Sequence, residues 1–195
     1  GGRLLTQPEA TGEEAHSGDA TRNPVPSAFA EASEEQTDID RLLQTAEERS
    51  LGVEGIEPLV SEEFYEVDIN PVNPTVDEEE WTLSVTGAVE QEVELTYEDL
   101  FGPQQEHRFA TLRCVGEPLN GEEIDTALWT GIPVDLLLEQ AGPSSDCECV
   151  MLRAADDYYE EFPLEALRGG LLAYGMHGAV LPRKHGFPLR ALVPG

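Results

Sequence analysis

The stretch Phe109-Ala-Thr-Leu-Arg-Cys-Val115 ends an apolar run in a cysteine, and the turn Gly116-Glu-Pro-Leu-Asn-Gly121 follows it directly. The pattern predicts a β-strand over residues 107–115 that delivers Cys114 to the end or edge of a sheet. Glycine in the turn lets the backbone bend closely round a bound group. A thiol in that position suits a soft metal. The alternative is a small buried hydrophobic residue, the commoner state of a lone cysteine.

A second block, Leu181-Pro-Arg-Lys-His-Gly-Phe-Pro-Leu-Arg-Ala-Leu-Val-Pro-Gly195, gathers basic side chains within a few positions. They are Arg183, Lys184, His185 and Arg190. The whole chain has 11 Lys+Arg against 40 Asp+Glu, so the block locally reverses the charge. An anionic ligand explains this reversal, because the arginine fork makes paired, charge-assisted bonds to phosphate oxygens. An internal cluster of salt bridges is the alternative.

Two further blocks, Trp129-Thr-Gly-Ile-Pro133 and Asp156-Asp-Tyr-Tyr-Glu-Glu-Phe-Pro163, lie between these. Over roughly Phe64–Gly195 the blocks resemble, in order and spacing, the sulfite-oxidase family of molybdopterin-dependent oxidoreductases. The resemblance implies an α+β fold with a mixed β-sheet, the molybdopterin-binding domain of the sulfite oxidase type, incomplete at its C-terminal end. It also implies a molybdenum–molybdopterin cofactor and two-electron oxygen-atom transfer on a small oxyanion, an S-oxide or an N-oxide.

The same resemblance implies roles for individual residues. Cys114 would bind molybdenum through its sulfur, and Tyr158 would be the catalytic side chain beside the metal. The implied cofactor-binding residues are Tyr65, Asp68, Asn70, Arg113, Asn120, His185 and Arg190. For Tyr158 the alternative is a tyrosine packed on the surface, and for the segment Phe64–Pro71 it is an ordinary extended strand. A metal-free binding or scaffold module that keeps the fold is the alternative for the whole chain.

The composition is strongly acidic, with a formal net charge of -29 over 195 residues. Nucleic acid and anionic membrane surfaces are therefore excluded as partners. Since 39% of residues are hydrophobic and the acids are interleaved with them, we expect a folded chain. Adaptation to high salt explains the charge, and an ordinary acidic protein is the alternative. The pair Cys147 and Cys149 is interpreted as two small apolar residues at the start of a strand.

The chain is predicted to have three parts: an acidic flexible linker over 1–32, a helical linker region over 33–60 and the partial oxidoreductase domain over 61–195. Apolar spacing predicts an amphipathic helix over 34–49. No run of about 18 apolar residues is present. Relatives often carry membrane helices ahead of this domain, so we expect a tether through a missing N-terminal segment and a location outside the cytoplasm; a cytoplasmic location is the alternative. The expected partners are a small-molecule substrate and an electron-transfer protein outside this chain.

Regular elements are expected throughout the domain. Strands are predicted over 81–86, 92–95, 150–154, 171–176 and 189–193. Thr96-Tyr-Glu-Asp99 resembles a capping box and predicts a short helix. A second short helix is predicted to begin at Pro133 and to end at Gly142.

Overall fold

The computed structural model describes residues 33–53, 59–61, 63–68, 72–102, 104–118 and 121–194. Its centre is a five-stranded sheet in the order β3-β4-β7-β8, in which β9 also pairs with β7. All of the described strand pairs are antiparallel. The strands are β3 (Glu106–Arg113), β4 (Ile124–Pro133), β7 (Leu171–Met176), β8 (Ala179–Val180) and β9 (Arg190–Leu192). Together with the helices they confirm the predicted α+β fold, but the described sheet is antiparallel and not mixed as expected.

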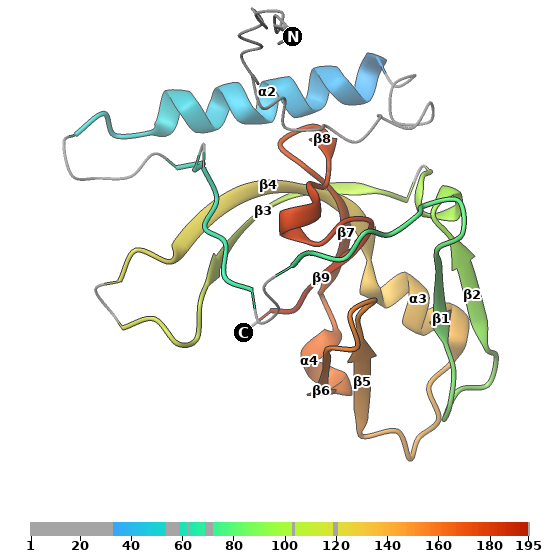
Figure 1. Cartoon of the computed structure of the whole chain (residues 1–195). Helices are drawn as coiled ribbons and strands as arrows, with labels where there is room; N and C mark the ends of the chain where they lie inside the picture. Colours follow the sequence, from blue (N-terminus) through green and yellow to red (C-terminus); the bar gives the residue numbers. More distant parts are fainter. Residues whose placement is uncertain are drawn as a thin grey trace, which may run out of the picture.

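The strand β4 is the central strand of the sheet, since it pairs with β3 from Ile124 to Gly131 and with β7 only from Trp129 to Pro133. The far ends of β3 and β4 therefore project as a curved ribbon (Figure 1). A register irregularity with β7 falls between Thr130 and Gly131. A Cβ atom at Gly131 would collide with the backbone carbonyl of Leu172, so only glycine allows this close approach.

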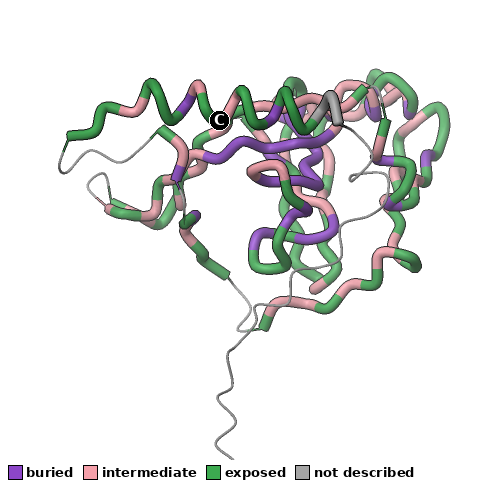
Figure 2. Tube along the Cα trace, turned by 90° about the horizontal axis from the view of Figure 1, so that it is seen from above, coloured by how far each residue is buried: buried purple, intermediate pink, exposed green. Residues whose placement is uncertain are grey.

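Buried side chains lie on both faces of the sheet, and Figure 2 shows the buried residues concentrated in the interior of the molecule. One face carries a cluster around Trp129 that includes Phe64, Leu171 and Leu181. The other face packs against α3 (Val134–Ala141). Gly142 ends this helix in the left-handed region at φ 62°, as predicted. Pro133 is the last residue of β4 and caps the helix, so the prediction that the helix begins at Pro133 was wrong by one residue.

Two hairpins lie beyond the central sheet and add side chains to the hydrophobic cluster around α3 (Figure 1). The first pairs β1 (Thr82–Val85) with β2 (Val93–Thr96), which confirms the two strands predicted there. The second pairs β5 (Cys149–Arg153) with β6 (Tyr159–Pro163), and α4 (Leu164–Leu167) follows it. The single turn η1 (Glu98–Leu100) comes after β2, where Asp99 Oδ2 accepts bonds from the Thr96 amide at 2.8 Å and the Thr96 hydroxyl at 2.7 Å.

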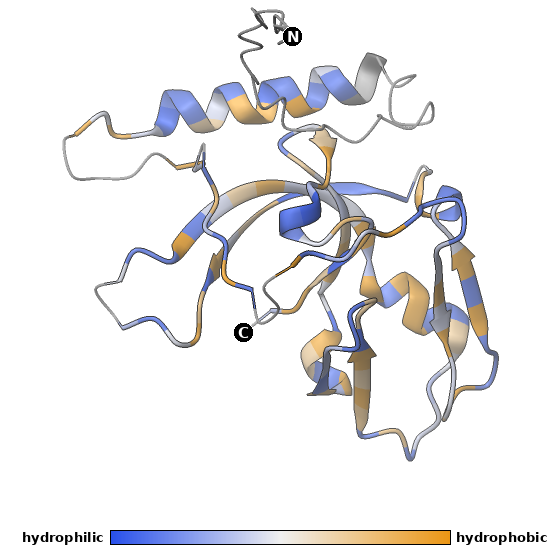
Figure 3. Cartoon of the chain, viewed as in Figure 1, coloured by the Kyte–Doolittle hydropathy of each residue, from blue (hydrophilic) through white to orange (hydrophobic). Residues whose placement is uncertain are grey.

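The helix α2 (Ser33–Arg49) lies across one end of the sheet, above the β7–β8 turn, which confirms the helix predicted over 34–49 (Figure 1). Its buried residues include Ile39 and Ala46. Figure 3 shows a mostly hydrophilic helix whose hydrophobic positions lie toward the sheet. In the described part of the chain, no helix combines the length and apolar content needed to cross a bilayer. The linker predicted over 1–32 lies outside the described residues.

Candidate functional site

Cys114 lies one residue beyond the end of β3, in the turn that leads to β4. Its amide donates to the Glu123 carbonyl at 3.0 Å, and its carbonyl accepts from the Glu117 amide at 3.2 Å. The thiol is half-buried and free of any disulfide. A Cβ atom at Gly116 would lie 3.8 Å from the sulfur, so glycine leaves that side of Sγ uncovered. The backbone is thus fixed while the sulfur stays available.

Arg113, the neighbouring residue, contributes to the shape of this turn. Its Nη2 donates to the Glu117 carbonyl at 2.7 Å, and the Glu117 carboxylate accepts from the Glu122 amide at 3.1 Å. The guanidinium therefore holds the turn that carries Cys114. Asn120, predicted as a cofactor contact in the same turn, lies outside the described residues, and so does Asn70.

The segment Ser61–Tyr65, in which residue 62 lies outside the described residues, has its described part beside β4, along the portion of that strand which β7 does not pair. The Ser61 amide donates to the Thr126 carbonyl at 3.0 Å. Asp125 accepts through both carboxylate oxygens, from the Ser61 hydroxyl at 2.6 Å and from the Tyr65 amide at 2.6 Å. Residues 63–68 form no regular strand. The two bonds to Asp125 therefore help to fix the path of the chain here.

The electrostatic surroundings of Tyr65 include residues from both the cysteine block and the C-terminal basic block. Burial raises the pKa of its phenol, the Arg190 guanidinium lowers it, and the Cys114 side chain and Asp125 raise it further. Cys114 and Arg190 are therefore both within electrostatic range of the Tyr65 hydroxyl. The cysteine turn, Tyr65 and β9 thus form one candidate site.

An aromatic cluster forms the floor of this site. The Phe64 ring packs edge-to-face on Trp129 and on His185, each at a centroid distance of 5.5 Å, and stacks on Tyr65 at 5.0 Å. Trp129 is fully buried, and its Nε1 donates to the Ala110 carbonyl at 3.2 Å. Phe64, Trp129 and Asp125 were not among the predicted site residues, although Trp129 belongs to one of the quoted blocks.

Arg190 presents a positive charge above that floor. Its Cζ lies 5.5 Å from the centroid of the Trp129 ring, and its Nη1 donates to the His185 carbonyl at 3.2 Å. Burial lowers the pKa of the guanidinium, while Tyr65 and Asp68 raise it. No carboxylate in the described ranges forms an ion pair with Arg190. A desolvated cation of this kind favours an anionic ligand.

The other basic residues of the block are engaged within the protein. In the turn η2 (Arg183–His185), Arg183 donates to the Asn73 carbonyl at 2.9 Å and to the Thr75 hydroxyl at 2.7 Å, and Lys184 lies 3.8 Å from the Glu66 carboxylate. His185 is buried, and desolvation together with Lys184 and Arg190 lowers its pKa to about 4. Its imidazole is therefore neutral at pH 7. An internal cluster accounts for Lys184 but not for Arg190.

Asp68 and Tyr158 lie at the border of the site. Partial desolvation and then the charge and hydrogen bond of Glu66 raise the pKa of Asp68, whereas Arg190 lowers it and Asp156 raises it. The β5–β6 turn thus approaches Asp68. Tyr158 is exposed, its hydroxyl donates to Glu160 Oε2 at 3.0 Å, and that bond is the first cause of its raised phenol pKa. The structure does not bring the Tyr158 hydroxyl into the cluster.

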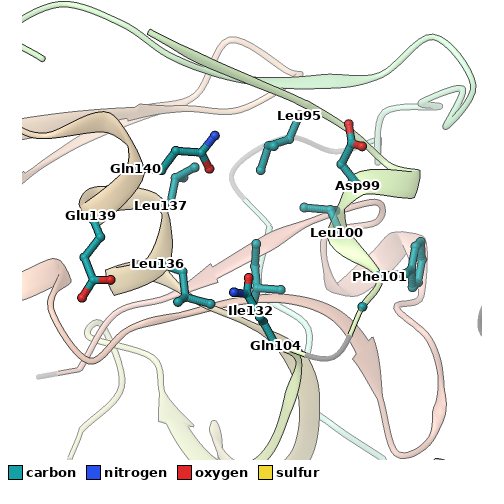
Figure 4. A pocket seen from close by; sticks show the side chains of 11 residues that line it. Leu95, Asp99, Leu100, Phe101, Gln104, Ile132, Leu136, Leu137, Glu139 and Gln140 are labelled. Atoms are coloured by element: carbon teal, nitrogen blue, oxygen red, sulfur yellow. The ribbon is translucent and has the colours of Figure 1, made fainter. Parts of the chain in front are cut away.

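Two other features lie apart from this site. Cys147 and Cys149 are free thiols at the start of β5, and no group of three potential metal-binding side chains occurs among the residues described. A cavity of about 550 Å³ opens between β2, η1, β4 and α3 (Figure 4). Its walls combine leucine and isoleucine side chains with Asp99, Glu139 and Gln140, and it contains none of the predicted site residues.

The donors at the site fit a molybdopterin cofactor. Cys114 offers a soft thiolate ligand with one side left uncovered by Gly116. Arg190 offers a half-buried charge for a phosphate, above an aromatic floor. The fold and the site together define a molybdopterin-binding oxidoreductase domain.

Residues 70–195 match the family described as the oxidoreductase molybdopterin binding domain, and the chain belongs to this family. The chain is 29% identical to the nitrate reductase (NADPH) of Beauveria bassiana over 139 residues, which is 59% of this chain and 16% of that protein. It is 26% identical to the nitrate reductase (NADH) of Spinacia oleracea over 152 residues, 63% of this chain and 16% of that protein. It therefore spans about a sixth of the length of these relatives.

The fold also matches a solved structure, the sulfane dehydrogenase SoxCD from Paracoccus pantotrophus, with a TM-score of 0.59. The match covers 95% of this chain and 52% of that chain at 18% identity. It confirms the fold that the sequence predicted, including segments outside the central sheet.

Proposed function

We propose that this chain forms the cofactor-binding part of a molybdenum enzyme that transfers an oxygen atom and two electrons to or from a small oxyanion, an S-oxide or an N-oxide. One observation carries the proposal: Cys114 is a free thiol in the turn after β3, and the half-buried guanidinium of Arg190 lies 5.5 Å above the Trp129 ring with no carboxylate partner among the described residues. A metal-bearing pterin needs two groups from its protein: a thiolate that binds the metal and a cation that binds the phosphate. The family and the nitrate reductases among its relatives support a redox enzyme.

The residues of the site have distinct roles in this proposal. Cys114 holds the metal through its deprotonated sulfur, and Arg190 holds the phosphate. The neutral His185 donates one N–H without adding a second charge. Phe64 and Trp129 exclude water beneath the cofactor. When bound, the cofactor supplies the two-electron chemistry, and the protein supplies its position and electrostatic surroundings.

The electron-transfer partner in this proposal lies outside the chain. With a net charge of -29, the surface favours a partner that presents basic residues at the contact. The rate of association with such a partner would fall with ionic strength, because electrostatic steering is screened by salt.

The test measures the metal and pterin content of the full-length wild type and of Cys114→Ala. The control is Cys149→Ala, because Cys149 is also a free thiol but is exposed. We expect the wild type and Cys149→Ala to carry molybdenum and pterin and to show a thiolate-to-metal absorption band. Cys114→Ala should lose the band and the oxygen-atom transfer while it retains part of the pterin. A wild type without molybdenum would contradict the proposal and favour a metal-free binding module. Full activity of Cys114→Ala would contradict the role of Cys114 as the ligand.

A further inference from the structure

Asp125 lies at the point where the Ser61–Tyr65 segment meets the sheet. It occupies the part of β4 that pairs with β3 on one side but has no β7 partner on the other. The Ser61 amide bonds the Thr126 carbonyl at 3.0 Å, so backbone contact alone fixes only the first residue of the segment. The Asp125 carboxylate bonds both ends of it: Oδ1 accepts from the Ser61 hydroxyl and Oδ2 from the Tyr65 amide, each at 2.6 Å.

In this contact both oxygens of the Asp125 carboxylate act as acceptors, and hydrogen bonds to a carboxylate are short and strong. An asparagine at 125 carries no charge: its oxygen can accept from the Tyr65 amide, but its N–H can reach Ser61 only if the hydroxyl turns to accept instead of donating. Replacement of Asp125 by asparagine would therefore remove the charge-assisted character of the contact with almost no change of shape.

The two aromatic residues held by this contact are the ones that border the site. Phe64 packs on Trp129 and His185, and the hydroxyl of Tyr65 lies within the electrostatic reach of Cys114 and Arg190. Phe64 is 5% exposed, so its ring depends on the segment staying against the sheet. If the Tyr65 amide were released, both rings could move away from the cysteine turn.

We propose that Asp125 is a positioning residue of the cofactor site: its bonds to Ser61 and Tyr65 hold the Phe64–Tyr65 pair as a wall between Cys114 and Arg190. This inference rests on the proposed function, because it assigns the wall to the bound pterin. Asp125 contributes no ligand of its own; it acts through the orientation of Tyr65.

The chain contains a matched control for this contact. Asp99 also accepts from a backbone amide and a hydroxyl, both of Thr96, at 2.8 and 2.7 Å. That contact closes the turn η1 and takes no part in the aromatic cluster around Phe64. Asp99 uses a single oxygen for both bonds, so Asp99→Asn matches Asp125→Asn in removing the charge from a carboxylate that bonds an amide and a hydroxyl, at a place that does not border the site.

The experiment compares the full-length wild type with Asp125→Asn, Ser61→Ala, Ser61→Thr and Asp99→Asn. Hydrogen exchange of the peptide over 61–68 measures whether the segment is held, and pterin content after release by denaturation measures the site. In Asp125→Asn and Ser61→Ala we expect exchange about ten-fold faster and pterin content reduced by about half or more, because the first removes the charge from the contact and the second removes one of its bonds. Ser61→Thr keeps the hydroxyl and should match the wild type. Asp99→Asn should exchange faster only around η1 and should keep its pterin.

The two proposals fail in different ways. A wild type that contains no pterin overturns the proposed function, and the role of Asp125 with it. Equal pterin content in the wild type and in Asp125→Asn overturns the role of Asp125 alone. Unchanged hydrogen exchange over residues 61–68 in Asp125→Asn does so as well. Equal pterin loss in Asp99→Asn would show a general loss of stability and would also overturn it. If Asp125→Asn does not fold, Ser61→Ala decides the question, since it leaves the carboxylate in place.

Discussion

His185 and Arg190 lie five residues apart and share a hydrogen bond, but they carry different charges at neutral pH. The imidazole is buried beside two cations, which favours its neutral form. The guanidinium keeps its charge although burial lowers its pKa. The site thus holds one fixed positive charge beside a neutral donor, an arrangement that binds one anionic group without a second buried cation.

The neutral state of His185 predicts a pH dependence of stability. Its pKa is about 4 in the folded protein against 6.5 for a solvent-exposed histidine, so the unfolded chain binds more protons between these two values. The free energy of unfolding should therefore fall as the pH drops below about 6.5, by about 2–3 kcal/mol at pH 4.5 from this residue alone.

Urea unfolding of the wild type and of His185→Gln at pH 7.5 and 4.5 measures this dependence. The glutamine variant should lack this part of the loss, while the contribution of the carboxylates is common to both proteins and cancels in the comparison. Parallel pH curves for the two proteins would contradict the prediction.

The site could be predicted from sequence only in part. Cys114, Tyr65, His185 and Arg190 were predicted, because the types and order of their blocks resemble a known family. Asp125 was not, since its role depends on a contact with Tyr65 across 60 positions of the chain. No local pattern distinguishes that aspartate from the other acids of so acidic a chain.

At the scale of elements, strict alternation of polar and apolar residues predicted the strand over 81–86, which the structure confirms as β1. The central strand β4 was not predicted, because Ala127–Pro133 is buried or half-buried throughout and a Gly-Ile-Pro sequence ends it, which indicates a turn. The strand β6 was missed because Glu160 and Glu161 are adjacent, exposed acids on a short hairpin. A period of two in the sequence indicates a strand that is buried on one face only. β4 lacks this period because most of its residues are buried or half-buried, and β6 lacks it because most of its residues are exposed.

The attachment of α2 can be tested at Gly178. This residue has φ +76°, and a Cβ atom on it would lie 2.8 Å from Ile39 Cγ2. We expect Gly178→Ala to loosen α2, seen as faster hydrogen exchange over residues 36–49, and to cost about 2–4 kcal/mol by strain and displaced packing.

Gly169→Ala is the matched control, since Gly169 has φ +71° and no atom within 4 Å of its added Cβ. It should cost only the backbone strain, about 1–2 kcal/mol, and leave the exchange of α2 unchanged. Equal effects of the two substitutions on α2 would show that the contact with Ile39 does not hold the helix.

At the scale of the whole molecule, the charge is unevenly placed. The chain carries 40 acids against 11 Lys+Arg, and exposed acids occupy the helix α2 and both hairpins. Arg190 is nevertheless partly buried near the centre, beside the aromatic floor. Repulsion among surface carboxylates should therefore weaken the fold in dilute salt, while the site keeps its positive potential.

The free energy of unfolding should rise steeply with potassium chloride. Screening reduces the Debye length from about 10 Å at 0.1 M to about 3 Å at 1 M, which relieves repulsion between carboxylates. Circular dichroism during urea unfolding at 0.1, 1 and 3 M salt would measure the change, with sucrose as a neutral cosolute control. Equal stability at 0.1 and 3 M salt would contradict the prediction.

The pairing of β9 with β7 has a consequence for how the protein is made. Ala173 pairs with Arg190, so β9 completes an edge of the central sheet only after every other described element has left the ribosome. Until then the Trp129 ring lacks the Arg190 guanidinium above it. Under the proposed function, cofactor insertion follows translation of β9, because a nascent chain paused before residue 190 would contain Cys114 without the cation proposed to hold the phosphate.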